Sequence, residues 1–424
     1  MNIKIYTAIL YLALPFVFLR LLWRSRKNPA YRDNWRQRLG HCDTTLGDKV
    51  IWIHAVSVGE TQAAEPLVKK LQNVFPTHQI LITTTTPTGT DRVRKLYGDT
   101  VAHSYFPFDL PFAVERFLDQ VNPVLLLMME TEVWPNLLAE SSLRGIPTLL
   151  ANARMSEKSA KGYASLGKLA KETFSYIDQV AAQSEDDAQR FIDLGVHPDR
   201  VQVIGSLKFE VKLPASLLEQ AEVLRRAVCS SRPAWVAAST RDGEEKAVLM
   251  AHRQVLKKMP DALLILVPRH PERFNKVAQL CKRKKFTVAR RSEGQDCHPQ
   301  TQVYLGDTMG ELSLFLAVAD AAFVGGSLVK LGGQNILEPA ALGVPIAFGP
   351  HMFNFAEISR MFLQRGAAVQ VDGAAKLGEV MSNWLYDAGE RTRFGEQGRQ
   401  LIEENRGATQ RLIELVTAAV PEES

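Results

Sequence analysis

The glycine-rich segment from Gly325 to Pro345 reads GGSLVKLGGQNILEPAALGVP and has residue types suited to binding a polar small molecule. An apolar run typical of a strand, residues 320–324, precedes it, and an apolar helical pattern follows. Glycine permits positive φ and lets backbone N–H groups come close to a ligand. Asn335 and Glu338 have the spacing of a helix N-cap box. The segment matches neither GxGxxG nor a P-loop, so it predicts either a ligand loop of another kind or a simple tight turn.

Carboxylates stand at several other predicted helix entrances. Ser57-Val-Gly-Glu60 and Thr308-Met-Gly-Glu311 repeat the pattern of a cap residue and an acid, and Glu130-Thr-Glu132 follows it more loosely. An acid at this spacing stabilises a helix start by itself, so a purely structural role stays open for each. In HAVSVGE (54–60), however, a strand ends in a small-residue turn. There Glu60 is placed to accept a proton from a hydroxyl nucleophile, whereas His54 has the position of a structural strand-end histidine.

Two other places in the sequence supply positive charge. Lys208 follows a strand in GSLK, and the run from Pro268 to Arg273 (PRHPER) follows the apolar run 263–267. Fixed cations and helix N-termini neutralise the charge that grows on a phosphate leaving group, and they do so without a metal. The sequence has no HExxH motif and its four cysteines share no close spacing, so we expect neither a zinc site nor a disulfide framework.

Strand and helix patterns alternate along the chain in two series, which predicts α/β architecture. The predicted strands of the first series are Val50–Val56, Ile80–Thr85, Val124–Met129, Pro147–Ala151 and Val180–Ala182, with helices near 61–75, 88–97, 111–120, 136–143, 157–175 and 185–194. Those of the second are Ala234–Ala238, Leu263–Val267, Phe286–Ala289, Gln302–Leu305, Ala321–Val324, Pro345–Phe348 and Ala367–Val371, followed by helices near 375–387, 390–403 and 407–418. We expect two Rossmann-like domains, 25–212 and 213–424, with parallel sheets facing a central cleft, and a last helix that can cross back to the first domain.

Residues 1–24 form a predicted membrane anchor. The stretch 5–19 carries no charge, and basic and aromatic residues follow it, as at the cytoplasmic interface of a membrane. Pro15 and Arg20 weaken a clean span, so spanning and lying flat both remain open. The alternative to an anchor is a buried N-terminal helix. A chain of 424 residues with 46% hydrophobic residues and a net charge of only +5 is a folded protein and not a general nucleic-acid binder.

Six motifs in order resemble one family, the 3-deoxy-D-manno-octulosonic acid (Kdo) transferases of lipopolysaccharide assembly. They are HAVSVGE (54–60), ETEVWPN (130–136), GSLKF (205–209), PRHPERF (268–274), GDTMGEL (306–312) and GGSLVKLGGQNILEP (325–339). The resemblance implies a GT-B fold and inverting, metal-independent transfer of Kdo from CMP-Kdo to lipid IVA, with no cofactor. It also implies anchoring among the lipids of the bacterial inner membrane with the catalytic domains on the cytoplasmic face. We expect two Kdo additions, as in the enzymes of enteric-type bacteria.

The resemblance also implies roles for particular residues. Glu60 matches the general base, and Glu130 and Lys208 match the pair that stabilises the transition state. The residues that match the CMP-binding segments are Pro268, Arg269, Met309, Gly310, Glu311, Asn335, Ile336, Leu337 and Glu338, with Glu338 on the ribose hydroxyls. Domain 25–212 would then bind the acceptor and domain 213–424 the donor. Gln334 stands where the family's loop is expected to have histidine.

Two other functions remain open. A different GT-B transferase or a sugar-nucleotide epimerase would share the fold, and preference for cytidine or uridine nucleotides would separate them from the leading interpretation. A membrane-tethered, non-catalytic nucleotide-binding protein is the third. The set of acids and cations argues against it, since a pure binder needs no base.

Overall fold

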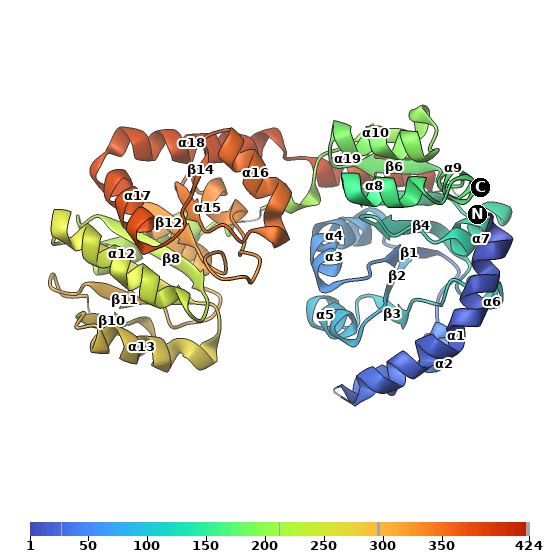
Figure 1. Cartoon of the computed structure of the whole chain (residues 1–424), viewed down its shortest axis with the longest axis horizontal. Helices are drawn as coiled ribbons and strands as arrows, with labels where there is room; N and C mark the ends of the chain where they lie inside the picture. Colours follow the sequence, from blue (N-terminus) through green and yellow to red (C-terminus); the bar gives the residue numbers. More distant parts are fainter. Residues whose placement is uncertain (27, 212, 295–296, 421–424) are drawn as a thin grey trace. The chain divides into compact units, whose positions relative to one another are not determined.

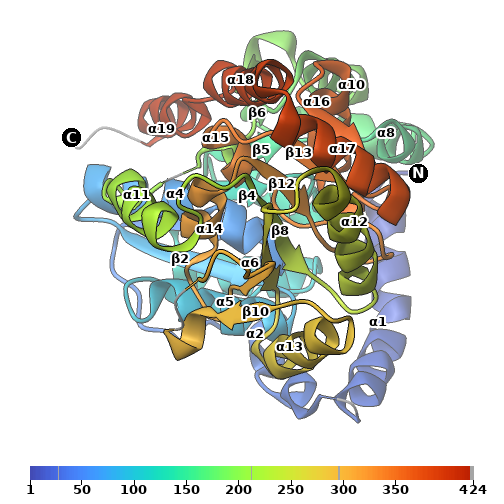
Figure 2. The same cartoon turned by 90° about the vertical axis from the view of Figure 1, so that its left-hand side faces the viewer.

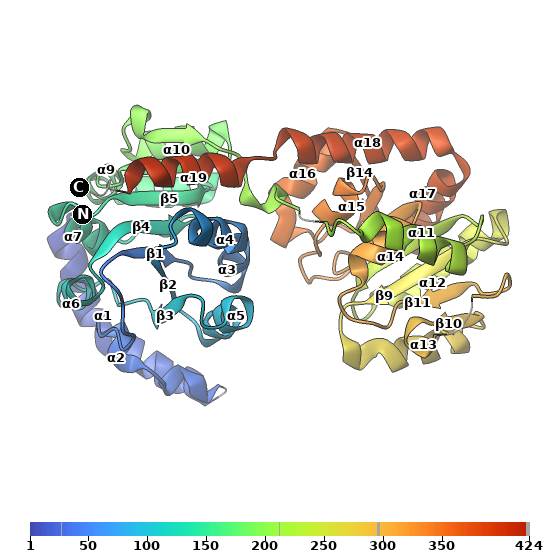
Figure 3. The same cartoon turned by 180° about the vertical axis from the view of Figure 1, so that it is seen from behind.

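The computed structural model describes residues 1–26, 28–211, 213–294 and 297–420, and the chain divides into two compact units (Figure 1). Unit 1 comprises Met1–Glu210 with Arg406–Ser424, and unit 2 comprises Val211–Asn405. The second domain was expected to extend over 213–424, but it ends at Asn405, and the segment that begins at Arg406 belongs to unit 1. Helix α19 (Ala408–Ala419) buries Leu412 and Val416 in the core of unit 1 and packs on α4 (Figure 3), because its apolar face finds its partners there.

The sheet of unit 1 has seven parallel strands in the order β3-β2-β1-β4-β5-β6-β7. Their bounds are β1 Val50–His54, β2 Gln79–Thr84, β3 Ala102–Tyr105, β4 Pro123–Met129, β5 Thr148–Ala153, β6 Gln179–Ala182 and β7 Val201–Val203. The five strands expected from the sequence are confirmed. The prediction missed β3 and β7, which are short edge strands without a continuous apolar run.

The helices of unit 1 connect these strands. They are α1 Ile3–Ser25, η1 Pro29–Arg32, α2 Trp35–Arg38, α3 Val58–Ala63, α4 Glu65–Val74, α5 Pro87–Tyr97, α6 Pro111–Val121, α7 Pro135–Leu143, α8 Glu157–Ala164, α9 Lys168–Ser175, α10 Glu185–Leu194, η2 Pro198–Arg200 and η3 Leu207–Phe209. Two expected single helices are each divided in two. The pattern 61–75 breaks ahead of Pro66, and the pattern 157–175 breaks at Gly167, which has φ +59°.

Helix α1 lies along unit 1 and is fastened to it by polar side chains. The Tyr6 hydroxyl donates to Asp109 Oδ2 at 3.0 Å, and the Thr7 hydroxyl donates to Asn136 Oδ1 at 2.9 Å. The opposite face exposes an apolar stripe with helical spacing. It consists of Ile5, Ile9, Leu12, Phe16, Leu19 and Trp23, each at least half exposed. By length and composition, Ile3–Ser25 is also sufficient to cross a membrane.

The sheet of unit 2 has seven parallel strands in the order β10-β11-β9-β8-β12-β13-β14, all predicted from the sequence. Their bounds are β8 Ala234–Thr240, β9 Leu263–Pro268, β10 Val288–Arg290, β11 Val303–Leu305, β12 Ala321–Val324, β13 Ile346–Phe348 and β14 Ala368–Gln370. The helices of unit 2 are α11 Leu217–Val228, α12 Glu244–Lys258, η4 Pro271–Arg273, α13 Phe274–Arg283, η5 Arg291–Glu293, α14 Leu312–Val318, α15 Leu337–Ala341, η6 Phe353–Phe355, α16 Ala356–Gln364, α17 Ala374–Tyr386 and α18 Ala388–Glu404.

Helices cover both faces of the second sheet, as its apolar strands require. Helices α12, α13 and α17 share one core cluster with the sheet, and α11 and α14 share the other. Figure 2 shows α11 and α12 on opposite sides of β8. Each sheet reverses its strand order at one point, between β1 and β4 in unit 1 and between β8 and β12 in unit 2. Ligands of open α/β sheets bind at the carboxyl ends of such strands.

Candidate active site

Glu60 lies at the switch point of unit 1, in the first turn of α3. Strand β1 ends at His54, and a turn of small residues leads to Ser57, which caps the helix by accepting the Glu60 N–H at 3.2 Å. The Ser57 hydroxyl donates back to Glu60 Oε1 at 2.8 Å, and the Val56 N–H donates to Oε2 at 2.8 Å. The side chain is thus held in one orientation, while each oxygen keeps a lone pair for a further proton.

Glu130 and Lys208 meet at the carboxyl end of β4. Lys208 Nζ lies 3.6 Å from Glu130 Oε1, and Arg154 Nε lies 3.2 Å from Oε2. Glu130 has φ +55°, a strained conformation that costs about 1–3 kcal/mol and is concentrated at functional sites. Asn152, fully buried with φ +52°, accepts the Leu207 N–H at 3.0 Å and so fixes the turn that carries Lys208. The structure therefore brings together the two residues to which the family resemblance assigns stabilisation of the transition state.

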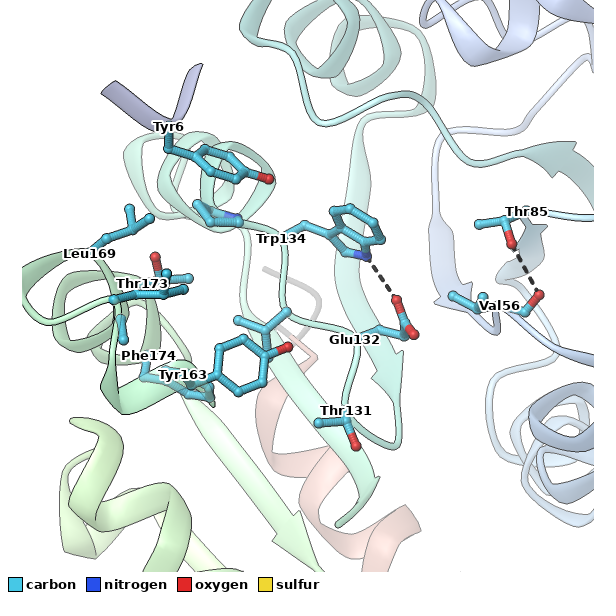
Figure 4. Close-up of a pocket in the computed structure, with 14 residues that line it drawn as sticks. Tyr6, Val56, Thr85, Thr131, Glu132, Trp134, Tyr163, Leu169, Thr173 and Phe174 are labelled. Carbon is cyan, nitrogen blue, oxygen red and sulfur yellow. Dashed lines mark hydrogen bonds between the residues drawn. The ribbon is translucent and has the colours of Figure 1, made fainter. Parts of the chain in front are cut away.

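Glu132 completes a cluster of acids and lines a pocket. The pocket has a volume of 540 Å³ and lies between the β4–α7 loop, α1, α8 and α9 (Figure 4). Burial and the nearby Glu60 carboxylate raise the pKa of Glu132 to about 7, although the Trp134 indole N–H donates to it at 3.1 Å. Spacing in the sequence did not separate Glu130 from Glu132. In the structure Glu130 faces the two cations, whereas Glu132 faces the pocket.

The surroundings of Glu60 suit a proton acceptor. Burial raises its pKa above the ordinary value, the Ser57 and Val56 hydrogen bonds oppose the shift, and the Glu130 charge adds to it. A base with a raised pKa holds a transferred proton more firmly, which is useful near neutral pH. His54 has no such role. It is fully buried, its Nδ1 pairs with Thr83 Oγ1 at 2.9 Å, and burial lowers its pKa to about 3.

The expected donor residues all lie at carboxyl ends of strands in unit 2. Pro268 ends β9, and the Arg269 N–H donates to the Thr240 carbonyl at 3.1 Å. Helix α14, which follows Met309–Glu311, contacts the segment Asn335–Glu338, since the Ser313 hydroxyl donates to Glu338 Oε2 at 3.2 Å. Ile336 and Leu337 are buried, so their side chains position this turn. Both predicted segments thus lie in unit 2, and α14 connects the first of them to the second.

Two of the three predicted capping boxes have a different geometry. Ile336 is the cap of α15, and Asn335 accepts the Leu337 N–H at 3.0 Å while its amide donates to Glu338 at 3.1 Å. Glu311 itself occupies the cap position of α14, and the Arg291 guanidinium binds it through two nitrogens, at 2.6 and 3.1 Å. Spacing alone could not reveal these arrangements, because they depend on side chains and turns outside the motif.

Arg291 and Glu244 were not predicted as site residues from the sequence. Arg291 follows β10 in a basic stretch without a distinctive motif, so no local signal marks it. Glu244 does have a signal in the sequence. Gly243-Glu244-Glu245 begins the helix that follows the first strand of the second sheet, and Glu60 lies at the corresponding place in the first sheet. Among the described residues, no group of three or more His, Cys, Asp or Glu side chains is arranged to hold a metal ion.

Two parallel α/β units with polar loops at their switch points are the architecture of the GT-B class. The chain resembles the solved UDP-GlcNAc 2-epimerase of Neisseria meningitidis bound to UDP-GlcNAc, with a TM-score of 0.56 over 87% of this chain and 100% of that one. At 14% identity this likeness concerns the fold alone. The chain has a GT-B fold.

Sequence relatives specify the family. The family model described as 3-Deoxy-D-manno-octulosonic-acid transferase (kdotransferase) matches residues 33–211. The chain is 43% identical over 417 residues to the 3-deoxy-D-manno-octulosonic acid transferase of Haemophilus influenzae, covering 97% of each protein. It is 37% identical over 377 residues to that of Bordetella pertussis, covering 86% of each. The chain belongs to the Kdo transferase family, and it is a glycosyltransferase.

Proposed function

We propose that this protein transfers Kdo from CMP-Kdo to lipid IVA with inversion, adding two Kdo residues in succession. The observation that carries the proposal is the cluster at the switch point of unit 1, where a buried, oriented carboxylate stands beside a carboxylate–cation pair. Membership of the Kdo transferase family supports Kdo as the transferred group. No metal or cofactor takes part in the proposed reaction.

In the proposed mechanism Glu60 takes the proton of the acceptor hydroxyl. The acceptor oxygen forms the new bond to the anomeric carbon of Kdo while the bond from that carbon to the phosphate oxygen breaks, and CMP leaves with the electron pair. Lys208, oriented by Glu130, stabilises the charge that develops in the transition state. The raised pKa of Glu60 favours its acceptance of the proton.

The donor nucleotide is assigned to the loops of unit 2. The proposed CMP-binding residues are Pro268, Arg269, Met309, Gly310, Glu311, Asn335, Ile336, Leu337 and Glu338. Arg269, exposed at the end of β9, supplies positive charge for the phosphate, and Glu338 accepts hydrogen bonds from the ribose hydroxyls. The Glu338 carboxylate is already oriented for this by Asn335 and Ser313.

The surroundings of Glu132 support an acyl-chain-bearing acceptor. Tyr163 of α8 and Leu169, Ala170 and Phe174 of α9 form one apolar wall of the 540 Å³ pocket. A second cavity of 260 Å³ lies beneath α1, lined by Leu10, Leu14, Val17 and Phe108 among others. Apolar cavities beside a general base suit an acceptor whose reacting hydroxyl stands close to hydrocarbon.

Helix α1 is proposed to lie in the cytoplasmic surface of the bacterial inner membrane. Its apolar stripe is exposed along one side, while Tyr6 and Thr7 hold the other side against unit 1. A spanning helix would have to break both hydrogen bonds, whereas an in-plane helix keeps them. Basic residues of the same region, Arg20, Arg24, Arg26, Arg32 and Arg36, fit anionic lipid headgroups.

The double variant Leu12→Ser/Phe16→Ser tests this attachment better than deleting residues 1–24, because α1 also covers a cavity. Losing two exposed apolar side chains should weaken sedimentation with anionic vesicles by about tenfold or more. The matched control is Leu143→Ser, which removes a residue of unit 1 that is 83% exposed and lies outside α1. Equal binding of both variants and the wild type would remove α1 from the attachment surface.

Mass spectrometry of lipid IVA after incubation with the detergent-solubilised protein and CMP-Kdo tests the reaction. A mass gain of two Kdo units supports the full proposal, and a gain of one supports the reaction but not its stoichiometry. Intact donor and unmodified lipid IVA, with the protein folded, would refute the donor–acceptor pair. Because CMP-Kdo is labile, it should be generated in the same reaction.

A further inference from the structure

Glu244 is a buried carboxylate at the switch point of unit 2 that binds the glycine-rich loop after β12. It is the first residue of α12 and is 1% exposed. Its Oε2 accepts the N–H groups of Gly326 at 2.7 Å and of Arg241 at 2.9 Å. Its Oε1 accepts those of Ser327 at 3.0 Å and of Leu328 at 2.9 Å. Four backbone donors therefore converge on one carboxylate.

Three successive N–H groups of this kind form a concavity that binds anions, often phosphate, in many proteins. Here the anion is the protein's own Glu244 carboxylate. An ionised carboxylate has about four lone-pair positions, and the four N–H donors match that number. The first half of the glycine-rich loop is thus already occupied, so its amides are not available to a donor phosphate.

The loop is shaped to admit this carboxylate closely. A Cβ at Gly325 would lie 2.8 Å from the Ser239 carbonyl oxygen and 3.0 Å from Glu244 Oε2, so a larger residue would push the loop away. Gly326 follows with φ +69°. The Ser327 hydroxyl accepts the Gly349 N–H at 2.8 Å and so joins the loop to the residue after β13.

The anchored half of the loop holds the half that leads to the proposed CMP-binding turn. The Gly333 N–H donates to the Gly326 carbonyl at 2.8 Å, and the Gln334 N–H donates to the Gly325 carbonyl at 3.1 Å. The next residue is Asn335. If Gly325 and Gly326 moved, these two hydrogen bonds would therefore move Gly333 and Gln334 as well, and with them the adjoining segment Asn335–Glu338.

We propose that Glu244 is a positioning residue of the donor site. Its carboxylate fixes the glycine-rich loop and thereby places Asn335–Glu338 for CMP. The inference rests on the proposed function in one respect, namely the assignment of CMP to that turn. The two parts of the loop then have different roles. The part with the anion-binding geometry is structural, and the part after Gly333 contacts the nucleotide.

The test is CMP binding to the full-length protein in detergent, measured by calorimetry, together with donor KM and kcat. Glu244→Gln keeps the size of the side chain but turns an NH₂ group toward backbone donors. We expect the Kd for CMP and the KM for CMP-Kdo to rise about tenfold, with kcat changed less than about threefold. Glu244→Asp, which keeps the charge, should recover part of the affinity. Glu219→Gln, an exposed acid in the first turn of α11 of the same unit, is the matched control.

The outcomes separate this inference from the proposed function. Wild-type CMP affinity in folded Glu244→Gln overturns the positioning role and leaves the proposed function intact. A folded wild-type protein that does not bind CMP overturns the donor assignment itself. A lower Tm with equal losses in CMP affinity and kcat would indicate general destabilisation and overturn the inference as well. If Glu244→Gln does not fold, affinity of Glu244→Asp equal to that of the wild type would count against it.

Discussion

Glu60 and Glu244 occupy equivalent places in the two units, yet their surroundings differ. Each lies in the first turn of the helix that follows the central strand at the switch point, β1 in unit 1 and β8 in unit 2. Glu60 accepts one backbone N–H and one hydroxyl, and the loop of the neighbouring strand β4 brings Glu130 and Glu132 close to it. Glu244 accepts four backbone N–H groups, three of them from the loop of the neighbouring strand β12.

The difference shows that the neighbouring loop decides what such a carboxylate can do. Where that loop supplies negative charge and burial, the pKa rises and the carboxylate is suited to take a proton. Where the loop supplies N–H groups, every lone pair is occupied and the carboxylate serves as a fixed support. The same topological position thus carries a candidate base in one unit and a structural anchor in the other.

The largest effect should come from Glu60→Gln. It removes the base but keeps hydrogen-bonding capacity toward Ser57, so kcat should fall by about 10³-fold while CMP binding persists. Transfer of Kdo measured by mass spectrometry, with calorimetry of CMP on the same preparation, checks both. Loss of CMP binding by the folded variant would show that Glu60 does not act on the acceptor side.

Lys208→Met should lower kcat by about 10²-fold, since it removes the cation proposed to stabilise the transition state. Arg154→Met is the matched control, because Arg154 also contacts Glu130 but has the more exposed side chain, 47% against 27% for Lys208. Steady-state kinetics of both variants should show the smaller loss for Arg154→Met. Equal losses would mean that neutralising Glu130 matters more than the position of the lysine.

Gly325→Ala tests the support in unit 2 from the loop side. The added Cβ would approach the Ser239 carbonyl oxygen and the Thr240 Cα to 2.8 Å, so the Kd for CMP should rise by about tenfold. Gly373→Ala is the control, because a Cβ there meets nothing within 4 Å. Calorimetry at one temperature compares the two, and unchanged CMP affinity of Gly325→Ala would argue that the loop tolerates displacement.

The smallest effect concerns pH. Glu60 must be deprotonated to act, so kcat/KM should rise with pH through its raised pKa and then level off. Glu130→Gln removes the negative charge that adds to the raised pKa of Glu60, so the acid limb of the kcat/KM profile should move to lower pH. A profile from pH 5 to pH 9 with Glu157→Gln, an exposed acid of α8, as control would detect it. A shift toward higher pH would contradict the proposed coupling.

Much of the fold could be predicted from the sequence because the buried strands are continuous apolar runs. All seven strands of unit 2 were found in this way, and β4, which reads PVLLLMM, is typical. Strands β3 and β7 were not predicted because AHSY and VQV are short and polar residues interrupt their apolar pattern. The site was partly predictable for a similar reason. Glu60, Glu130 and Lys208 stand beside recognisable strand ends, and the structure brings Glu130 and Lys208 within 3.6 Å.

The amino-acid sequence by itself determined the two α/β series, the apolar N-terminal helix and the acids at helix entrances, because these depend on local periodicity and spacing. Only the tertiary structure decided which acid is free to act. Glu244 meets the amides of residues 82 to 84 positions further along the chain, and no local pattern specifies such a contact. The same holds for α1 and α19. Their apolar faces could be predicted from the sequence, but the surface that each face covers depends on packing between distant segments.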